Sequence, residues 1–229
     1  MATLIFSIET VASDWGLLSA NAQKLLKRKK PSGQKLEEYK AGLSLSPLTG
    51  QIVSLAMYDV ERNLGAVYCV GAGSDIKDES FMYKVRSERE ILEDFWEGAC
   101  RYDTFVTFNG RSFAWPFLNH RSAINKISPS IEIDKHRYLI NQGLPYQIDL
   151  LDELTMYGAM RPNQSLQLFL AAYDIAYKSK YQSLDIAKLY KAGKFGGIAE
   201  KNSADVLSIM ELYEVWQEYF APRSFLNTR

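Results

Sequence analysis

The sequence is poor in the residues that build disulfide frameworks and zinc sites. It has two cysteines, Cys69 and Cys100, and two histidines, His120 and His136, among 229 residues. Two cysteines are too few to staple a small secreted domain or to supply a thiolate-rich zinc site, and both suit a reducing compartment. The composition therefore excludes a disulfide scaffold and a cysteine-based zinc domain, and we expect a cytoplasmic protein.

The sequence also lacks an excess of charge and a long apolar run. Its 27 Lys and Arg residues are balanced by 27 Asp and Glu residues, so the whole chain has no general attraction for nucleic acid. No stretch is long and apolar enough for a membrane span or a signal peptide. We therefore expect no membrane partner, and any surface for nucleic acid must be local.

One local excess of charge does occur, between about residues 20 and 45. Seven lysines and arginines against two glutamates leave a net charge of +5 in this stretch. Such a run commonly forms a solvated surface, but it can also follow a phosphate backbone. We interpret the chain as a single domain, residues 1–229, with a basic insertion at about 20–45.

The order of strand-like and helix-like segments predicts an α/β fold with a mixed sheet of about five strands. A capping box, Ser87 to Glu90, opens one helix, and Asp149 is placed to cap another. Residues 191–197, with three glycines, are expected to form a loop. The strands are expected at 4–10, 52–58, 66–70, 81–85 and 104–108, the middle three as an antiparallel set, and the last helix at about 198–220.

A turn in mid-chain separates the strand at 104–108 from a helix expected to begin near Ser112. Asn109 and Gly110 form this turn, because glycine tolerates the positive φ of a tight turn. Pro116 falls in the first turn of the helix, where its missing N–H costs nothing. A strand that leads to a helix N-terminus is a common place for phosphates to bind.

Carboxylates stand at two further places where burial is expected. Ser7 and Glu9 are two residues apart, so both lie on one face of the first strand. Asp205 begins an apolar stripe on the last helix that continues through Ile209 to Tyr219, and Lys201 lies one turn earlier on the same stripe. A buried carboxylate needs a partner, which a salt bridge or a metal ion can provide.

Three segments in order carry a resemblance to a known family. They are Ser-x-Glu at 7–9, Phe-Asn-Gly-x-x-Phe-Ala-x-Pro at 108–116 and Lys-x-x-x-Asp at 201–205. The chain resembles the 3'-5' exonucleases of the DEDD superfamily, closest to the branch related to the exonuclease domain of B-family DNA polymerases. The resemblance runs from about Leu4 to Phe220. It implies a ribonuclease H-like mixed sheet flanked by helices, a single-stranded 3' end as the partner, and Mg²⁺ or Mn²⁺ as the cofactor.

The chain departs from the family pattern at the residues that carry the chemistry. Glu9 and Asp205 match two of the four family carboxylates, whereas Ser7 and Ala114 stand where the other two are expected, and Lys201 replaces the tyrosine. The family set carries a charge of −4, but these residues carry −1. Because hard divalent cations need anionic oxygen ligands, we expect metal binding at Glu9 and Asp205 to be weak or absent and hydrolysis to be impaired.

Three functions remain open from the sequence. The first is a nucleic-acid-binding domain with impaired catalysis, in which Asn109, Gly110 and Phe113 contact the nucleotide by resemblance. The second is a working metal-dependent exonuclease, whose residues were altered by engineering or whose lost ligands are replaced by another carboxylate such as Asp149 or Asp152. The third is a structural subunit of a replication or repair assembly, held by protein partners.

Lys201 has two possible roles in this scheme. Its ammonium can act as an internal counter-ion between Glu9 and Asp205, because it is a compact charge on a flexible stem. Alternatively, the stem can extend so that the ammonium reaches solvent. The first role requires the lysine to be buried with both carboxylates, and the second requires it to be exposed.

Overall fold

The computed structural model describes residues 2–71, 73–77, 80–133, 135–160, 164–222 and 225. Within these ranges, seven strands form one sheet in the order β4-β5-β3-β2-β1-β6-β7. Their bounds are β1 (Thr3–Ala12), β2 (Gly50–Asp59), β3 (Leu64–Cys69), β4 (Ile76–Lys77), β5 (Phe81–Val85), β6 (Thr104–Thr107) and β7 (Tyr146–Asp149).

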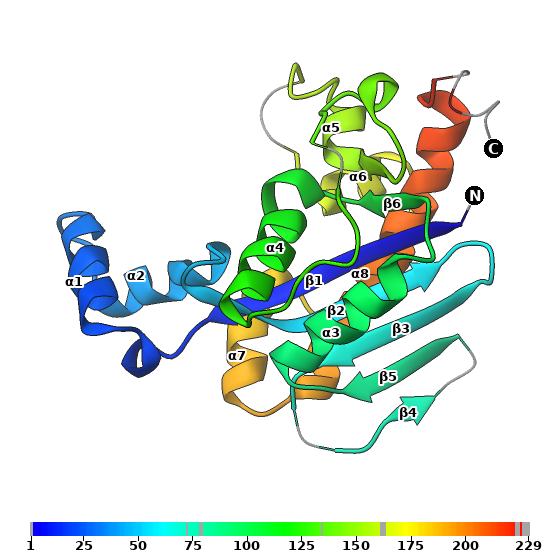
Figure 1. Ribbon diagram of the computed structural model, residues 1–229. Helices are drawn as coiled ribbons and strands as arrows, with labels where there is room; N and C mark the ends of the chain where they lie inside the picture. The colour runs from blue at the N-terminus through cyan, green and yellow to red at the C-terminus, as the bar shows by residue number, and fades with distance from the viewer. Residues whose placement is uncertain are drawn as a thin grey trace.

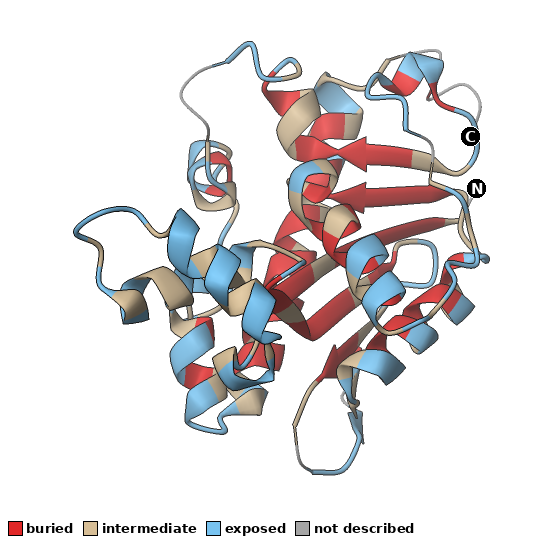
Figure 2. Cartoon of the chain, turned by 60° about the vertical axis from the view of Figure 1, so that its left-hand side comes forward, coloured by how far each residue is buried: buried red, intermediate tan, exposed pale blue. Residues whose placement is uncertain are grey.

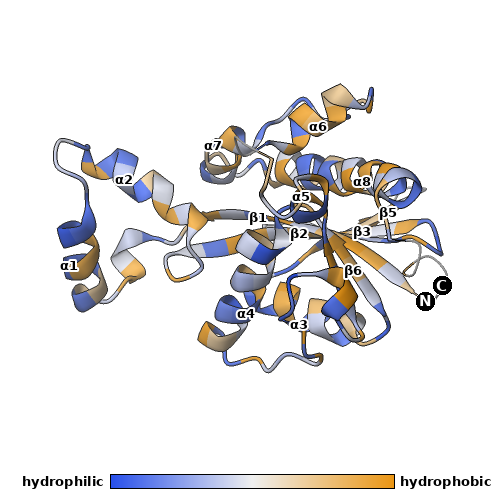
Figure 3. Cartoon of the chain, turned by 90° about the horizontal axis from the view of Figure 1, so that it is seen from above, coloured by the Kyte–Doolittle hydropathy of each residue, from blue (hydrophilic) through white to orange (hydrophobic). Residues whose placement is uncertain are grey.

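Eight α-helices accompany this sheet in the described ranges, and several of them cover its two faces. Their bounds are α1 (Ala20–Lys29), α2 (Leu36–Gly42), α3 (Glu88–Ala99), α4 (Trp115–Ile124), α5 (Leu150–Leu154), α6 (Leu166–Ala172), α7 (Ile186–Lys191) and α8 (Phe195–Tyr219). α3 and α4 lie on one face, and α6, α7 and α8 lie on the other, as the view from above shows (Figure 3). The α/β class with a mixed sheet flanked by helices is therefore confirmed.

Alternation along β1 divides the apolar core into two clusters. Leu4, Phe6 and Ile8 point to the side of α3 and α4, whereas Ile5 and Val11 point to the side of α8. A strand places successive side chains on opposite faces, so one buried strand can serve both clusters. β1 is internal in the sheet, between antiparallel β2 and parallel β6 (Figure 1).

Local signals in the sequence account for several helix ends. The Ser87 hydroxyl accepts from the Glu90 backbone N–H, and the Glu90 carboxylate accepts from the Ser87 N–H, so the capping box is confirmed. Asp149 caps α5 by accepting from the Leu151 N–H. Pro116 lies in the first turn of α4. These caps satisfy N–H groups that have no partner within the helix.

Two strand predictions were wrong. The sheet has seven described strands rather than about five, because β7 and the two-residue β4 were not expected. The segments 52–58 and 66–70 do pair antiparallel, but β5 runs parallel to β3. β4 pairs antiparallel with β5 at the edge of the sheet, so the chain reverses direction once more before β5. β4 has only two residues, which are too few to give the alternating pattern that would predict a strand from the sequence.

The last helix begins earlier than expected, and its buried stripe ends before Tyr219. α8 starts at Phe195, so Gly196 and Gly197 are helical rather than part of a loop. Glycine in a helix costs only about 1 kcal/mol, which packing of a long amphipathic helix outweighs. Tyr219 is 70% exposed, whereas Trp216 is fully buried. Even this longest helix is not apolar enough to span a membrane, and neither is any other helix of the described ranges.

Residues 13–49, which we call the arm, connect β1 to β2 and contain α1 and α2. Figure 1 shows both helices projecting away from the sheet. Neither helix contains a buried residue, and Figure 2 colours them as exposed or intermediate. The basic insertion expected at about 20–45 falls within this arm, although it forms two regular helices.

Candidate functional site

β1 and α8 bring two carboxylates and one lysine together inside the protein. The Lys201 ammonium donates hydrogen bonds to Glu9 Oε1 and, at 2.6 Å, to Asp205 Oδ2. The exposed fractions are 3% for Lys201, 7% for Glu9 and 5% for Asp205. Lys201 and Asp205 are one helical turn apart, so their side chains meet on the same face of α8. The lysine is therefore an internal counter-ion, and its ammonium does not reach solvent.

Tyr177 completes this group from outside the expected segments. Its hydroxyl donates to Asp205 Oδ1 at 2.8 Å, so each oxygen of Asp205 accepts a hydrogen bond. Sequence reasoning missed Tyr177, because it lies in the irregular chain between α6 and α7 and carries no periodic signal. Beside the group, Asn202 Nδ2 donates to Ser54 Oγ at 2.9 Å and ties α8 to β2.

Burial controls the electrostatics of the group. Burial raises the pKa of Glu9 to about 7; Lys201 lowers this pKa and the Asp205 charge raises it. Burial alone would lower the pKa of Lys201, but the charges of Glu9 and Asp205 outweigh it, and the net shift is upward. The pKa of the Tyr177 hydroxyl is raised by burial and by Asp205. The lysine therefore stays charged, and Tyr177 stays a hydrogen-bond donor.

This donor set does not fit a divalent cation. An ammonium already contacts both carboxylates, and a cation placed there would be repelled by it. Mg²⁺ and Mn²⁺ require several oxygen ligands, yet nowhere in the described ranges do three or more Asp, Glu, His or Cys side chains gather in a metal-binding arrangement. With Lys201 in this position, Glu9 and Asp205 form an ion-pair centre rather than a metal centre.

Ser7 and Ala114 lie in different surroundings. Ser7 shares the α8 side of β1 with Glu9, and its hydroxyl makes no hydrogen bond with a described residue. Ala114 is 5% exposed and belongs to the apolar cluster on the side of α3 and α4, together with Trp115 and Phe117. The Ala114 methyl group offers no ligand atom, so this position adds nothing polar to the Glu9–Lys201–Asp205 group.

The turn at Asn109 and Gly110 forms for a different reason from the one expected. Asn109 has φ 60° and occupies the left-handed region, which asparagine tolerates better than most residues. The φ of Gly110 is not positive. Gly110 is needed because a Cβ there would overlap the Thr107 side chain. A single π-helical turn, Gly110–Ala114, then leads into α4, so the helical chain starts before Ser112.

Asn109, Gly110 and Phe113 differ in what they can offer a nucleotide. The Asn109 side-chain amide makes no hydrogen bond to a described residue, so it is free to contact a ligand. Gly110 is buried. Phe113 is half-buried, and its ring packs against Phe117 with the centroids 4.9 Å apart. A nucleotide contact at these positions stays a prediction, with Asn109 the most accessible polar group.

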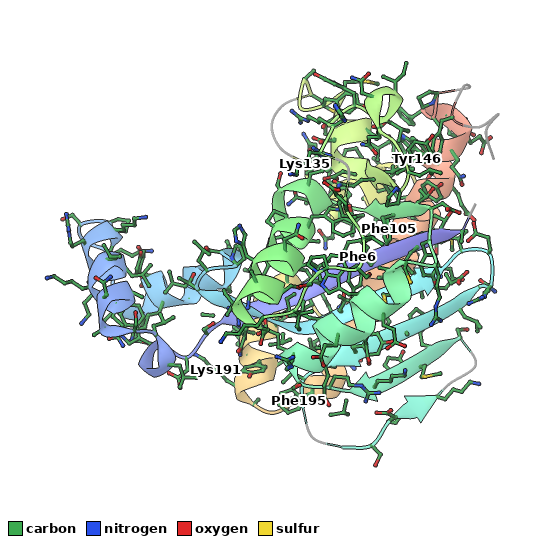
Figure 4. All side chains as sticks on the ribbon, in the orientation of Figure 1. Phe6, Phe105, Lys135, Tyr146, Lys191 and Phe195 are labelled. Atoms are coloured by element: carbon green, nitrogen blue, oxygen red, sulfur yellow. The ribbon has the colours of Figure 1, made fainter. Side chains whose placement is uncertain are left out.

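Aromatic rings beneath α4 form a packed layer. Phe6 from β1 and Phe105 from β6 lie next to each other in the sheet (Figure 4), with ring centroids 6.4 Å apart. Trp115 packs on both rings, 4.8 Å from Phe6 and 5.4 Å from Phe105. Rings held edge-on in this way are core residues, so Trp115 is not a stacking platform for an unpaired base.

Asp149 and Asp152 both have structural partners. The Asp149 carboxylate accepts from the backbone N–H groups of Asn109 at 2.8 Å, Arg111 at 2.9 Å and Leu151 at 3.0 Å. Burial raises its pKa to about 6, although these hydrogen bonds lower it. Asp152 pairs with Arg137 at 2.5 Å and with Arg111 at 3.6 Å. Asp149 therefore holds the mid-chain turn in place.

Comparison with protein families agrees with the fold. Residues 60–226 match a family described as a predicted 3'-5' exonuclease related to the exonuclease domain of PolB. The chain belongs to this exonuclease family. The match includes the Asn109–Gly110 turn and the whole of α8, whereas Ser7 and Glu9 precede it. A search among curated proteins found no match.

Family membership settles the general nature of the chain. It is a 3'-5' exonuclease-like domain with an α/β, ribonuclease H-like fold. The family as a whole points to nuclease-type chemistry, to nucleic acid as the class of partner and to divalent metals as cofactors. The Glu9–Lys201–Asp205 group departs from that expectation within this chain, because its ammonium stands between the two carboxylates.

Proposed function

We propose that this chain is a nucleic-acid-binding, exonuclease-like domain whose hydrolytic activity is impaired. The observation that supports the proposal is the position of the Lys201 ammonium, which bonds to both Glu9 and Asp205. Ser7, Ala114 and Lys201 are then the degenerate positions of the site, and Glu9 and Asp205 are its retained carboxylates.

The physical argument concerns what an ammonium can do in such a site. Hydrolysis by two divalent cations needs one to activate the attacking water and another to stabilise the leaving oxygen. An ammonium group offsets one of the two carboxylate charges, but it has no open coordination position for a water and carries only a single charge. Ser7 adds a neutral hydroxyl where an anionic ligand would be required. The group therefore preserves the structure of the site without its Lewis acidity.

Binding requires less than catalysis and can survive these changes. The expected ligand is a single-stranded 3' end, with the Asn109 amide and the turn at Gly110 and Phe113 beside the nucleotide. A role in DNA replication or repair belongs to the same proposal. A reducing, cytoplasmic location is consistent with Cys69 and Cys100, which are both unpaired.

An exonuclease assay tests the catalytic half of the proposal. A labelled single strand is incubated with the purified protein in Mg²⁺ or Mn²⁺, and released nucleotides are measured. We expect release at the background level. The combined variant Ser7→Asp, Ala114→Asp and Lys201→Tyr should recover measurable release, while each single change recovers little, because residues that act as a unit are non-additive. Metal-dependent digestion by the unmodified protein would show that a working nuclease is the correct interpretation.

A binding assay tests the other half. Fluorescence anisotropy with single-stranded DNA and RNA, carried out in excess EDTA, should show binding that is independent of divalent metal. Circular dichroism of each variant provides the folding control. If the folded protein binds neither nucleic acid, the result favours the third interpretation, a structural subunit that contacts only proteins.

A further inference from the structure

The arm, residues 13–49, is an addition to the part of the chain that matches the exonuclease family. The match begins at residue 60, so the arm lies outside it. The arm leaves β1 after Ala12, only three residues beyond Glu9 on the same strand. The base of the arm is therefore a close neighbour of the Glu9–Lys201–Asp205 group along the chain.

α1 carries four cations, and Lys24, Lys27 and Arg28 share one face while Lys29 lies on another. Lys27 and Arg28 follow Lys24 by three and four residues, which places both next to Lys24 on one face of the helix, and we call these three residues the row. Together with Ala20 and Gln23 they line an open hollow on the surface of the arm. Leu25 and Leu26 lie on other sides of the helix. With a rise of about 1.5 Å per residue, the row extends for roughly 6 Å along the helix axis.

The three cations have no internal partners. Lys24, Lys27 and Arg28 are exposed, and their side chains form no ion pair or hydrogen bond with any residue in the described ranges. Of the other cations of the arm, Lys29 and Lys35 are exposed away from this row, whereas Lys40 and Lys30 are engaged. Lys40 pairs with Glu37 at 2.7 Å, and the Lys30 ammonium donates to two backbone carbonyls. The row is therefore free, uncompensated positive charge.

The chemistry of the row selects a polyanion with regularly spaced charges. The Trp15 ring of the arm is already engaged, because the Lys40 ammonium lies over it at 5.3 Å from the ring centroid. Contacts from lysine and arginine to phosphates are independent of sequence and sensitive to salt. A nucleic-acid backbone fits these features better than an acidic protein, which would also need an apolar surface at the centre of its interface.

We propose that Lys24, Lys27 and Arg28 form a second nucleic-acid contact, which binds the phosphate backbone of the strand whose 3' end lies beside the Asn109 amide in the proposed function. This inference rests on the proposed function and adds a sequence-independent tether to it. The arm then increases the affinity for a nucleic-acid strand, and the sheet domain positions the 3' end of that strand.

The test is the salt dependence of binding. The variant Lys24→Gln, Lys27→Gln and Arg28→Gln is compared with the unmodified protein, using single strands of about 20 and about 4 nucleotides. α1 has no buried residue, so the fold and melting temperature should not change. For the long strand, loss of three phosphate contacts should reduce the slope of log K against log salt by about 2, because each contact contributes about 0.7. Binding of the short strand should change little.

A matched control separates a local contact from a general effect of charge. Lys77, Arg101 and Lys126 are exposed and lie outside the arm, and their change to Gln removes the same charge. The control should keep the slope of the unmodified protein. An unchanged slope in the arm variant, or an equal loss in both variants, overturns the inference while leaving the proposed function intact. If the unmodified protein binds neither strand, both proposals are wrong.

Discussion

Replacing Lys201 with methionine removes the counter-ion but keeps most of the side-chain volume. Glu9 and Asp205 would then face each other, buried, and among the described residues only Tyr177 would still donate a side-chain hydrogen bond to either. Removing one partner of a buried ion pair costs about 3–5 kcal/mol, because an uncompensated charge remains inside. We expect Lys201→Met to lower the free energy of unfolding by that amount near neutral pH.

The loss should depend on pH, with a sign that follows from Glu9. Its pKa is raised from 4.5 to about 7 in the folded state, so the folded protein binds more protons than the unfolded chain between these values. Stability from this group is fully present below about pH 4.5 and falls as pH rises to about 7. Without Lys201, which lowers this pKa, the fall continues above pH 7. The difference between variant and unmodified protein should therefore be larger at about pH 8 than at about pH 5.

Urea unfolding followed by circular dichroism at these two pH values measures both effects. Lys178→Met is the matched control: Lys178 pairs with Glu211 at 3.1 Å, but its side chain is 59% exposed. Loss of such a surface pair should cost less than about 1 kcal/mol. In addition, Mn²⁺ should raise the melting temperature of Lys201→Met more than that of the unmodified protein. A cost below about 1 kcal/mol for Lys201→Met, equal at both pH values, would refute the reasoning.

Three further substitutions test the supports of the site, each by urea unfolding. Asp149→Ala should cost about 3 kcal/mol, because the N–H groups that it accepts from lose their acceptor; a cost below about 1 kcal/mol would contradict this. Tyr177→Phe should cost about 1–3 kcal/mol by leaving one oxygen of buried Asp205 without a donor, and an unchanged midpoint would count against that role. Gly110→Ala should cost about 1–3 kcal/mol through overlap with Thr107, whereas a neutral result would mean that the turn adjusts freely.

Much of the local structure could be predicted from the sequence, because its causes lie within a few residues. The capping box at Ser87 and Glu90 depends on hydrogen bonds across three residues. Pro116 marks the first turn of its helix by its own geometry. The placement of Lys201 beside Asp205 follows from the helical repeat of 3.6 residues, and the spacing of Ser7 and Glu9 follows from the repeat of two in a strand.

Only the tertiary structure decided which distant groups meet. Lys201 bonds to Glu9 across 192 residues of sequence, and Tyr177 bonds to Asp205 across 28. The role of Gly110 likewise depends on how closely the turn passes Thr107, and the direction of β5 depends on the short edge strand β4. These pairings are set by packing of the sheet between its helices, which buries the charges and so requires them to find partners. Local periodicity cannot show which partner a buried charge will have, because burial is a property of the assembled core.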